Sequence, residues 1–117
     1  MKSIEIISIP VTNQQVAKEF YLKLGFNIIA EAPFQGGSNW IQMGLPDAQI
    51  SITLVNWFPE MPAGSVRGLV IKCDDLDKEI EELSTKGIEV APADKTPWGR
   101  FASVKDPDGN TLSLHEK

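Results

Sequence analysis

A segment near the start of the chain has hydrophobic residues at the spacing of an α-helix. Its apolar positions Val16, Phe20 and Leu24 recur every four residues. Asn13 can accept hydrogen bonds from the first free amides of such a helix, and Gly25 can adopt the left-handed conformation that ends one. The pattern therefore predicts a helix between Asn13 and Gly25.

The second half of the chain repeats this pattern. Asp75 is a candidate N-cap, Gly87 is a candidate stop, and an apolar stripe runs between them through Leu76, Ile80 and Leu83. The two caps are 62 positions apart (75 − 13), and so are the two glycines (87 − 25). An equal offset for start and stop indicates a duplicated structural unit.

Extended segments flank both predicted helices. Alternating and β-branched residues predict strands at 4–9, 26–30, 39–43, 49–55, 69–73, 88–91, 100–104 and 111–115. The resulting order is βαβββ twice, an α+β fold with both helices outside the sheets. Helices can cover only one face of each sheet, so the other face is free to line a pocket.

The length of 117 residues fits a single domain made of two modules. Pro59 and Pro62 lie in an irregular segment between the two repeats. We therefore divide the single domain 1–117 into a module at 1–56, a linker at 57–64 and a module at 65–117.

The charge balance excludes one class of partner. Eleven basic residues face sixteen acidic ones, for a net charge of −5, so a surface that tracks nucleic-acid phosphates is not expected. The single cysteine, Cys73, excludes an internal disulfide and fits a reducing compartment. No segment is long and apolar enough for a membrane span. We expect a cytoplasmic protein without membrane or nucleic-acid partners.

Two motifs carry a resemblance to a known family. Residues 16–26 read VAKEFYLKLGF, and residues 106–110 read DPDGN, a tight turn between the last two predicted strands. Together with the paired βαβββ units, they resemble the vicinal oxygen chelate superfamily of glyoxalases, extradiol dioxygenases and bleomycin-binding proteins. The resemblance covers the whole chain. It implies an incomplete eight-stranded barrel, often completed as a homodimer with a pocket shared between modules.

The resemblance also implies three metal-binding positions. They are a His seven residues before each helix cap and a Glu four residues after the glycine of DPDG. This chain has Ile6, Gly68 and Ser113 there, and Ile and Gly offer no donor while a neutral Ser hydroxyl is a poor ligand. We therefore expect no metal and no cofactor. The alternative is a shifted site that uses Glu5 and His115 from two subunits, although alternation turns Glu5 away from the pocket.

Strand alternation predicts which residues face the pocket. It places on that face Ile4, Ile6, Ser8, Val70, Lys72, Phe101, Ser103, Ser113 and His115. The opposite face is uniformly apolar and is expected to pack under the helices; it contains Ile7, Ile9, Leu69, Ile71, Cys73, Ala102, Val104, Leu112 and Leu114. Apolar walls with a few polar groups suit a small, partly hydrophobic molecule.

Aromatic and titratable residues complete the candidate site. Trp57 and Trp98 fall in loops and Trp40 on a strand, where they could stack on a ligand or, equally, pack a dimer. His115 is the first candidate for proton transfer, but no carboxylate partner is visible, so we assign no catalytic residue. Alternation places Arg100 on the helix side.

We therefore expect ligand contacts from ten residues: Ile6, Ser8, Trp40, Trp57, Lys72, Trp98, Phe101, Ser103, Ser113 and His115. The predicted function is metal-independent binding and sequestration of a small organic ligand by a homodimer. One alternative is a glyoxalase-like lyase, isomerase or dioxygenase with unconventional or no metal ligands. Another is a protein-binding module that uses the aromatic loops.

Overall fold

The structure, a computed structural model, describes residues 1–117 except for the side chain of Ala93. The first unit contains β1 (Ile6–Pro10), α1 (Gln14–Leu24), β2 (Asn27–Pro33), a single 3₁₀ turn η1 (Gln35–Gly37), β3 (Asn39–Gly44) and β4 (Ser51–Val55). The second contains β5 (Leu69–Lys72), α2 (Leu76–Thr85), β6 (Val90–Thr96), β7 (Gly99–Lys105) and β8 (Thr111–Glu116). The predicted order, βαβββ twice, is confirmed.

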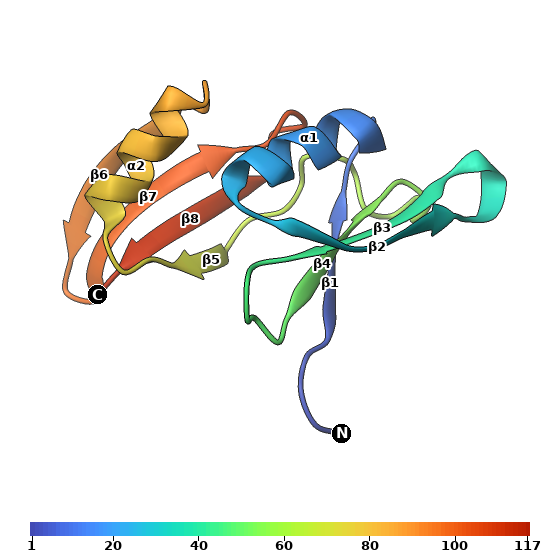
Figure 1. Cartoon of the computed structure of the whole chain (residues 1–117), viewed down its shortest axis with the longest axis horizontal. Coiled ribbons are helices and arrows are strands. Elements are labelled where there is room, and N and C mark those ends of the chain that lie inside the picture. Colours follow the sequence, from blue (N-terminus) through green and yellow to red (C-terminus); the bar gives the residue numbers. More distant parts are fainter.

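The strands form two separate four-stranded sheets with the same topology. Their orders are β1-β4-β3-β2 and β5-β8-β7-β6, and in each sheet the first pair is parallel and the others are antiparallel. Figure 1 shows the sheets side by side, with α2 over the second sheet and α1 toward the middle of the molecule. Among the described strands, none of one sheet pairs with one of the other, so the barrel is open and β1 and β5 are free edges.

Both predicted N-caps are present. The Asn13 side chain accepts hydrogen bonds from the backbone amides of Gln15 and Val16, and Gly25 ends α1 with φ of +117°. Asp75 accepts from the amide of Lys78 at 3.1 Å and so starts α2. Among the described residues, neither α1 nor α2 reaches the length and apolar character of a membrane-crossing helix.

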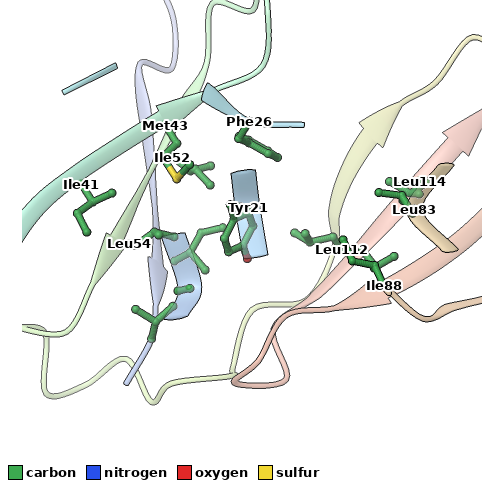
Figure 2. Close-up of a cluster of buried hydrophobic side chains, with 14 of the residues drawn as sticks. Tyr21, Phe26, Ile41, Met43, Ile52, Leu54, Leu83, Ile88, Leu112 and Leu114 are labelled. Carbon is green, nitrogen blue, oxygen red and sulfur yellow. The ribbon is translucent and has the colours of Figure 1, made fainter. Parts of the chain in front are cut away.

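The predicted apolar face packs under a helix in both sheets, whereas β4 is buried on both of its faces. In the first sheet, α1 covers side chains that are fully or almost fully buried, namely Ile9, Ile41, Met43, Ile52 and Leu54. In the second, α2 covers Ala102, Val104, Leu112 and Leu114. Figure 2 shows the buried side chains of the two units as two neighbouring groups. The faces that the helices leave uncovered hold the candidate site.

Several strand boundaries differ from the prediction. β1 begins at Ile6 because its partner β4 begins at Ser51, and Ile4 is left 62% exposed. β2 continues to Pro33 and β6 to Thr96, since each pairs with the next strand as one arm of a long hairpin. Both are edge strands with a bulge, where proline within the sheet is tolerated. The division at 57–64 stays a prediction.

The DPDGN turn has a second role that its sequence did not indicate. Asp106 accepts from the amides of Asp108 and Asn110, both at 2.9 Å, and also from the Tyr21 hydroxyl of α1. Asn110 is completely buried; it donates to the carbonyl of Pro10 at 2.8 Å and accepts from the amide of Val66. The turn therefore joins the second unit to β1 and α1, and it also binds the backbone just before β5.

Candidate binding site

The free face of the first sheet carries a strip of neutral hydrogen-bonding groups. Trp40 donates its indole N–H to Oε1 of Gln42 at 3.3 Å, and Nε2 of Gln42 donates to the Ser51 hydroxyl at 2.9 Å. The Ser8 and Thr53 hydroxyls lie 3.4 Å apart. On this face, the described strands β1, β3 and β4 carry no charged residue. The residues whose positions face this side are Ile6, Ser8, Pro10, Trp40, Gln42, Gly44, Ser51, Thr53 and Val55.

An aromatic cluster stands at one end of this strip. It is formed by Phe34, Trp40, Trp57 and Phe58, with ring centroids 4.7 Å apart for Phe34–Trp57 and 5.7 Å for Phe34–Trp40. The two indoles are nearly parallel, at 20°, with centroids 6.3 Å apart. Phe34 and Phe58 are 39% and 40% exposed, so the cluster presents ring surface to the outside. Aromatic surface of this kind stacks on flat ligands.

Two of these aromatic residues were absent from the predicted site. Phe34 and Phe58 lie in irregular segments, where alternation assigns no face. The polar residues Gln42, Ser51 and Thr53 were also absent, although alternation along β3 and β4 places them on the same face as Trp40. The signal that could have identified them was the strand periodicity already applied to β1.

The free face of the second sheet differs in chemistry. Phe101 of β7 and His115 of β8 are paired in register, and their rings stack with centroids 4.3 Å apart and planes at 18°. Ser103 pairs with Ser113, which also lies opposite Val70 of β5. Lys72 lies opposite His115 at the end of β5 and is exposed. This face therefore combines an aromatic stack, hydroxyls and a cation.

Trp98 contributes its backbone rather than its ring to this face. The side chain is 75% exposed, whereas the carbonyl oxygen lies 2.9 Å from Nε2 of His115. Gly99 follows with φ of +126°, and a Cβ built on it would lie 2.9 Å from Nε2 of His115. Glycine at this position thus lets the imidazole lie close to the backbone.

Arg100 lies on the helix side, as alternation predicted. It donates to Asp77 of α2 at 2.7 Å and to Glu116 at 3.4 Å. The hydrogen bonds and charge of Arg100 lower the pKa of the Asp77 carboxyl below its ordinary value. Glu116 also accepts from the amide of Leu76 at 2.8 Å, at the start of α2. Arg100 therefore fastens α2 to β8 and does not face the candidate site.

The three positions that hold metal ligands in related enzymes do not fit a divalent cation here. Ile6 faces outward from β1 opposite Ser51, while Ser113 lies on the other sheet and Gly68 directly precedes β5. Neither Ile6 nor Gly68 has a donor atom in its side chain. The described residues contain no group of three metal-ligating side chains. Glu5 and His115, the alternative pair, belong to different units of the chain.

One cavity does not coincide with the predicted site. It has a volume of about 750 Å³ and lies between α1 and the β6–β7 hairpin, where its walls include Phe20, Lys86, Val90 and Lys105. Ser103 is the one predicted ligand residue that lines it. The other nine lie elsewhere: Ile6, Ser8 and Trp40 in the first unit, Trp57 shortly after β4, and Lys72, Trp98, Phe101, Ser113 and His115 in the second unit. The predicted ligand residues thus form two separate groups, one in each half of the chain.

Comparison with known proteins places the chain in a family. The profile of the Glyoxalase/Bleomycin resistance protein/Dioxygenase superfamily matches residues 3–114. TnmS3 of Streptomyces sp. CB03234, described as an antibiotic binding protein, is 40% identical; the match covers 99% of this chain and 96% of that one, with a TM-score of 0.94.

Two further relatives match nearly the whole chain. A glyoxalase/bleomycin resistance protein from the same Streptomyces strain is 42% identical over 97% of this chain and 99% of its own, with a TM-score of 0.86. The uncharacterized protein YetH of Bacillus subtilis is 30% identical over 99% of both chains. The chain therefore belongs to the Glyoxalase/Bleomycin resistance protein/Dioxygenase superfamily.

Proposed function

We propose that this protein binds and sequesters a small, partly hydrophobic organic molecule on the free faces of its sheets, without a metal. The observation that carries the proposal is the aromatic cluster of Phe34, Trp40, Trp57 and Phe58, next to the uncharged polar strip on the face of the first sheet opposite Ile41, Met43 and Leu54. Ligand pockets combine apolar walls with a few placed polar groups. The description of TnmS3 as an antibiotic binding protein supports the same class of function.

The proposal includes a homodimer, which would join the two groups of predicted ligand residues. β1 and β5 leave one edge unpaired, and unpaired edges readily pair with another chain. Exposed apolar side chains lie on or near these edges, including Ile4 and Val70. Pairing β1 with β5 of a second copy would turn the free face of one first sheet toward the free face of the other chain's second sheet. The pocket would then be lined by both copies.

The proposal of metal independence rests on the residues at the three ligand positions: Ile6 and Gly68 offer no donor atom, and the Ser113 hydroxyl is a poor metal ligand. A cytoplasmic location is also part of the proposal, supported by the single cysteine. Sequestration requires only that the ligand be held away from its target, so no reacting group is needed on either face.

The test is ligand binding by purified protein, measured by isothermal titration calorimetry with naphthalene, quinoline, 7-methoxycoumarin and 7-hydroxycoumarin. We expect saturable binding of at least one of these flat molecules. Trp40→Ala should weaken it about tenfold, since a stacked aromatic contact contributes on the order of 1 kcal/mol beyond its buried area. Leu22→Ala, on the exposed surface of α1, is the matched control. Binding of none of the panel, or equal loss in both variants, would overturn the proposal.

A further inference from the structure

We infer that His115 presents Nδ1 as a fixed hydrogen-bond acceptor on the free face of the second sheet, and that the site selects aromatic ligands carrying a hydroxyl or N–H donor. The inference rests on the proposed function, because it specifies the chemistry of the same ligand site. It assigns His115 a role in specificity rather than in proton transfer.

The contact with Trp98 sets the tautomer of His115. Its Nε2 lies 2.9 Å from the carbonyl oxygen of Trp98, and a carbonyl oxygen can only accept a hydrogen bond. Nε2 must therefore carry the hydrogen. In a neutral imidazole one nitrogen is protonated and the other has a free lone pair, so Nδ1 is the acceptor. The tautomer follows from the hydrogen-bond partner, as is usual for histidine.

The Nδ1 atom of His115 is accessible to a ligand. Within the described part of the chain, the imidazole of His115 makes its hydrogen bond through Nε2. Every buried side-chain nitrogen or oxygen among the described residues has a hydrogen-bond partner. Nδ1 of His115 has no partner within the described residues, so it is not a buried atom. It can accept a hydrogen bond from water or from a ligand that replaces the water.

Neighbouring groups hold the imidazole ring in one orientation. The imidazole stacks on Phe101 with ring centroids 4.3 Å apart, and its Nε2 lies 2.9 Å from the position that a Cβ on residue 99 would take. The hairpin that supplies the Trp98 carbonyl is itself held, since the Thr96 hydroxyl donates to the carbonyl of Gly99 and accepts from the amide of Trp98. An acceptor that is fixed before binding loses little freedom on binding.

The neighbouring groups define what a ligand would meet. Ser113 and Ser103 lie beside the stack and can donate or accept, and Lys72 opposite His115 can only donate. Asp94 lies opposite Phe101 in register and is a second acceptor on the same face. Glu116 is turned to the other face, where it contacts Arg100 and the start of α2. Nδ1 of His115 is thus an acceptor that belongs to the aromatic stack itself.

A flat ligand stacked near Phe101 and His115 gains affinity if it carries a donor in its plane. Replacing an O–H by an O–CH₃ removes that donor and keeps the ring. The two coumarins of the panel form such a pair, because they differ in this group alone. We expect the wild-type protein to bind 7-hydroxycoumarin about threefold to tenfold more tightly than 7-methoxycoumarin, the range for one net hydrogen bond.

The experiment compares the two Kd values by calorimetry, at a pH at which the probe hydroxyl carries its proton. His115→Phe keeps the stack on Phe101 and removes the acceptor, so the ratio of the two Kd values should fall to about one, with the Kd of 7-methoxycoumarin unchanged. Asp94→Asn is the matched control, since it alters the other acceptor on this face, and its ratio should stay at the wild-type value. Thermal unfolding confirms that both variants are folded.

The outcomes separate the inference from the proposed function. Equal Kd values for the two coumarins in the wild-type protein would overturn the inference and leave the proposed function standing. A preference that survives His115→Phe, or that is lost in Asp94→Asn, would also overturn it. Binding of other panel members but of neither coumarin has the same consequence. If no member of the panel binds, the proposed function fails as well.

Discussion

The hydroxyl of Tyr21 donates to Oδ2 of Asp106 at 2.9 Å, across 85 positions of the sequence. Tyr21 is completely buried and belongs to α1, whereas Asp106 is the first residue of the DPDGN turn between β7 and β8. The hydrogen bond therefore joins the two units of the chain. We expect this contact to help hold the two sheets in their relative position, because it lies at the junction between the units.

We predict that Tyr21→Phe lowers the free energy of unfolding by about 1.5–3 kcal/mol, the range for a hydrogen bond to a charged group. Urea denaturation measures this change. Thr12→Val is the control, since the Thr12 hydroxyl donates to Asp108 of the same turn at an exposed position and should matter less. A loss for Tyr21→Phe no greater than that for Thr12→Val would show that the buried contact does not hold the units together.

The same pair predicts the response to alkaline pH. Two effects raise the pKa of Tyr21 above its ordinary value: the larger is burial, and the next is the charge of the Asp106 carboxylate. A pKa raised by folding adds stability below the unfolded pKa, and that stability is lost as the pH rises toward the folded pKa. The free energy of unfolding should therefore fall above about pH 10, the ordinary pKa of tyrosine. Tyr21→Phe should remove this part of the pH dependence. If the free energy of unfolding of the variant fell with pH in the same way as that of the wild type, the prediction would be wrong.

Gly99 is predicted to be essential for the orientation of His115. A Cβ at residue 99 would approach Nε2 of His115 to 2.9 Å and would also meet the carbonyl of Glu116, at a φ of +126° that other residues rarely adopt. Gly99→Ala should destabilise the protein by roughly 1–3 kcal/mol and abolish the preference between the coumarins. Gly36→Ala is the control, because it also has a positive φ but meets nothing within 4 Å. Similar coumarin ratios in both variants would be inconsistent with a fixed imidazole.

Arg100 should be dispensable for ligand binding although its neighbours on β7 are not. Arg100→Gln removes the contact with Asp77, so the pKa of that carboxyl should rise back toward its ordinary value, as NMR titration would report. The Kd for 7-hydroxycoumarin should change less than about twofold, whereas Phe101→Ala should weaken it about tenfold. A larger loss for Arg100→Gln would mean that its side chain turns to the ligand face.

The faces of the strands could be predicted because alternation is a local property. Ile9, Val104 and Leu112 are buried as expected, and Ser113 and His115 share the other face. Long-range pairing was not visible in the pattern. The ends of β2 and β6 are set by hairpin partners, and no local signal connects Asp106 with Tyr21.

The details of the site were less predictable for a similar reason. Trp98 was expected to act through its ring, but its exposed side chain leaves the backbone carbonyl as the group that meets His115. A carbonyl is present at every residue, so composition cannot mark this one. The aromatic cluster required Phe34 and Phe58 to come together from two irregular segments. Residue identity alone does not predict such a contact.

Metal should have no effect on the protein's ligand binding or stability. The side chains of Ile6 and Gly68 offer no donor at two of the three positions used by related enzymes. Dialysis against a chelator, followed by addition of Zn²⁺ or Mn²⁺, should leave both the Tm and the Kd for 7-hydroxycoumarin unchanged. A Tm that falls on chelation and recovers with one equivalent of metal would contradict metal independence.

The central claim is that the ligand lies on the free faces of the sheets, and a crystal structure of the protein with 7-hydroxycoumarin tests it most directly. We expect a dimer with the coumarin between the aromatic cluster at Trp40 and Trp57 of one chain and the Phe101–His115 stack of the other. A coumarin seated instead in the cavity of about 750 Å³ between α1 and the β6–β7 hairpin, beside Phe20 and Lys86, would contradict the account.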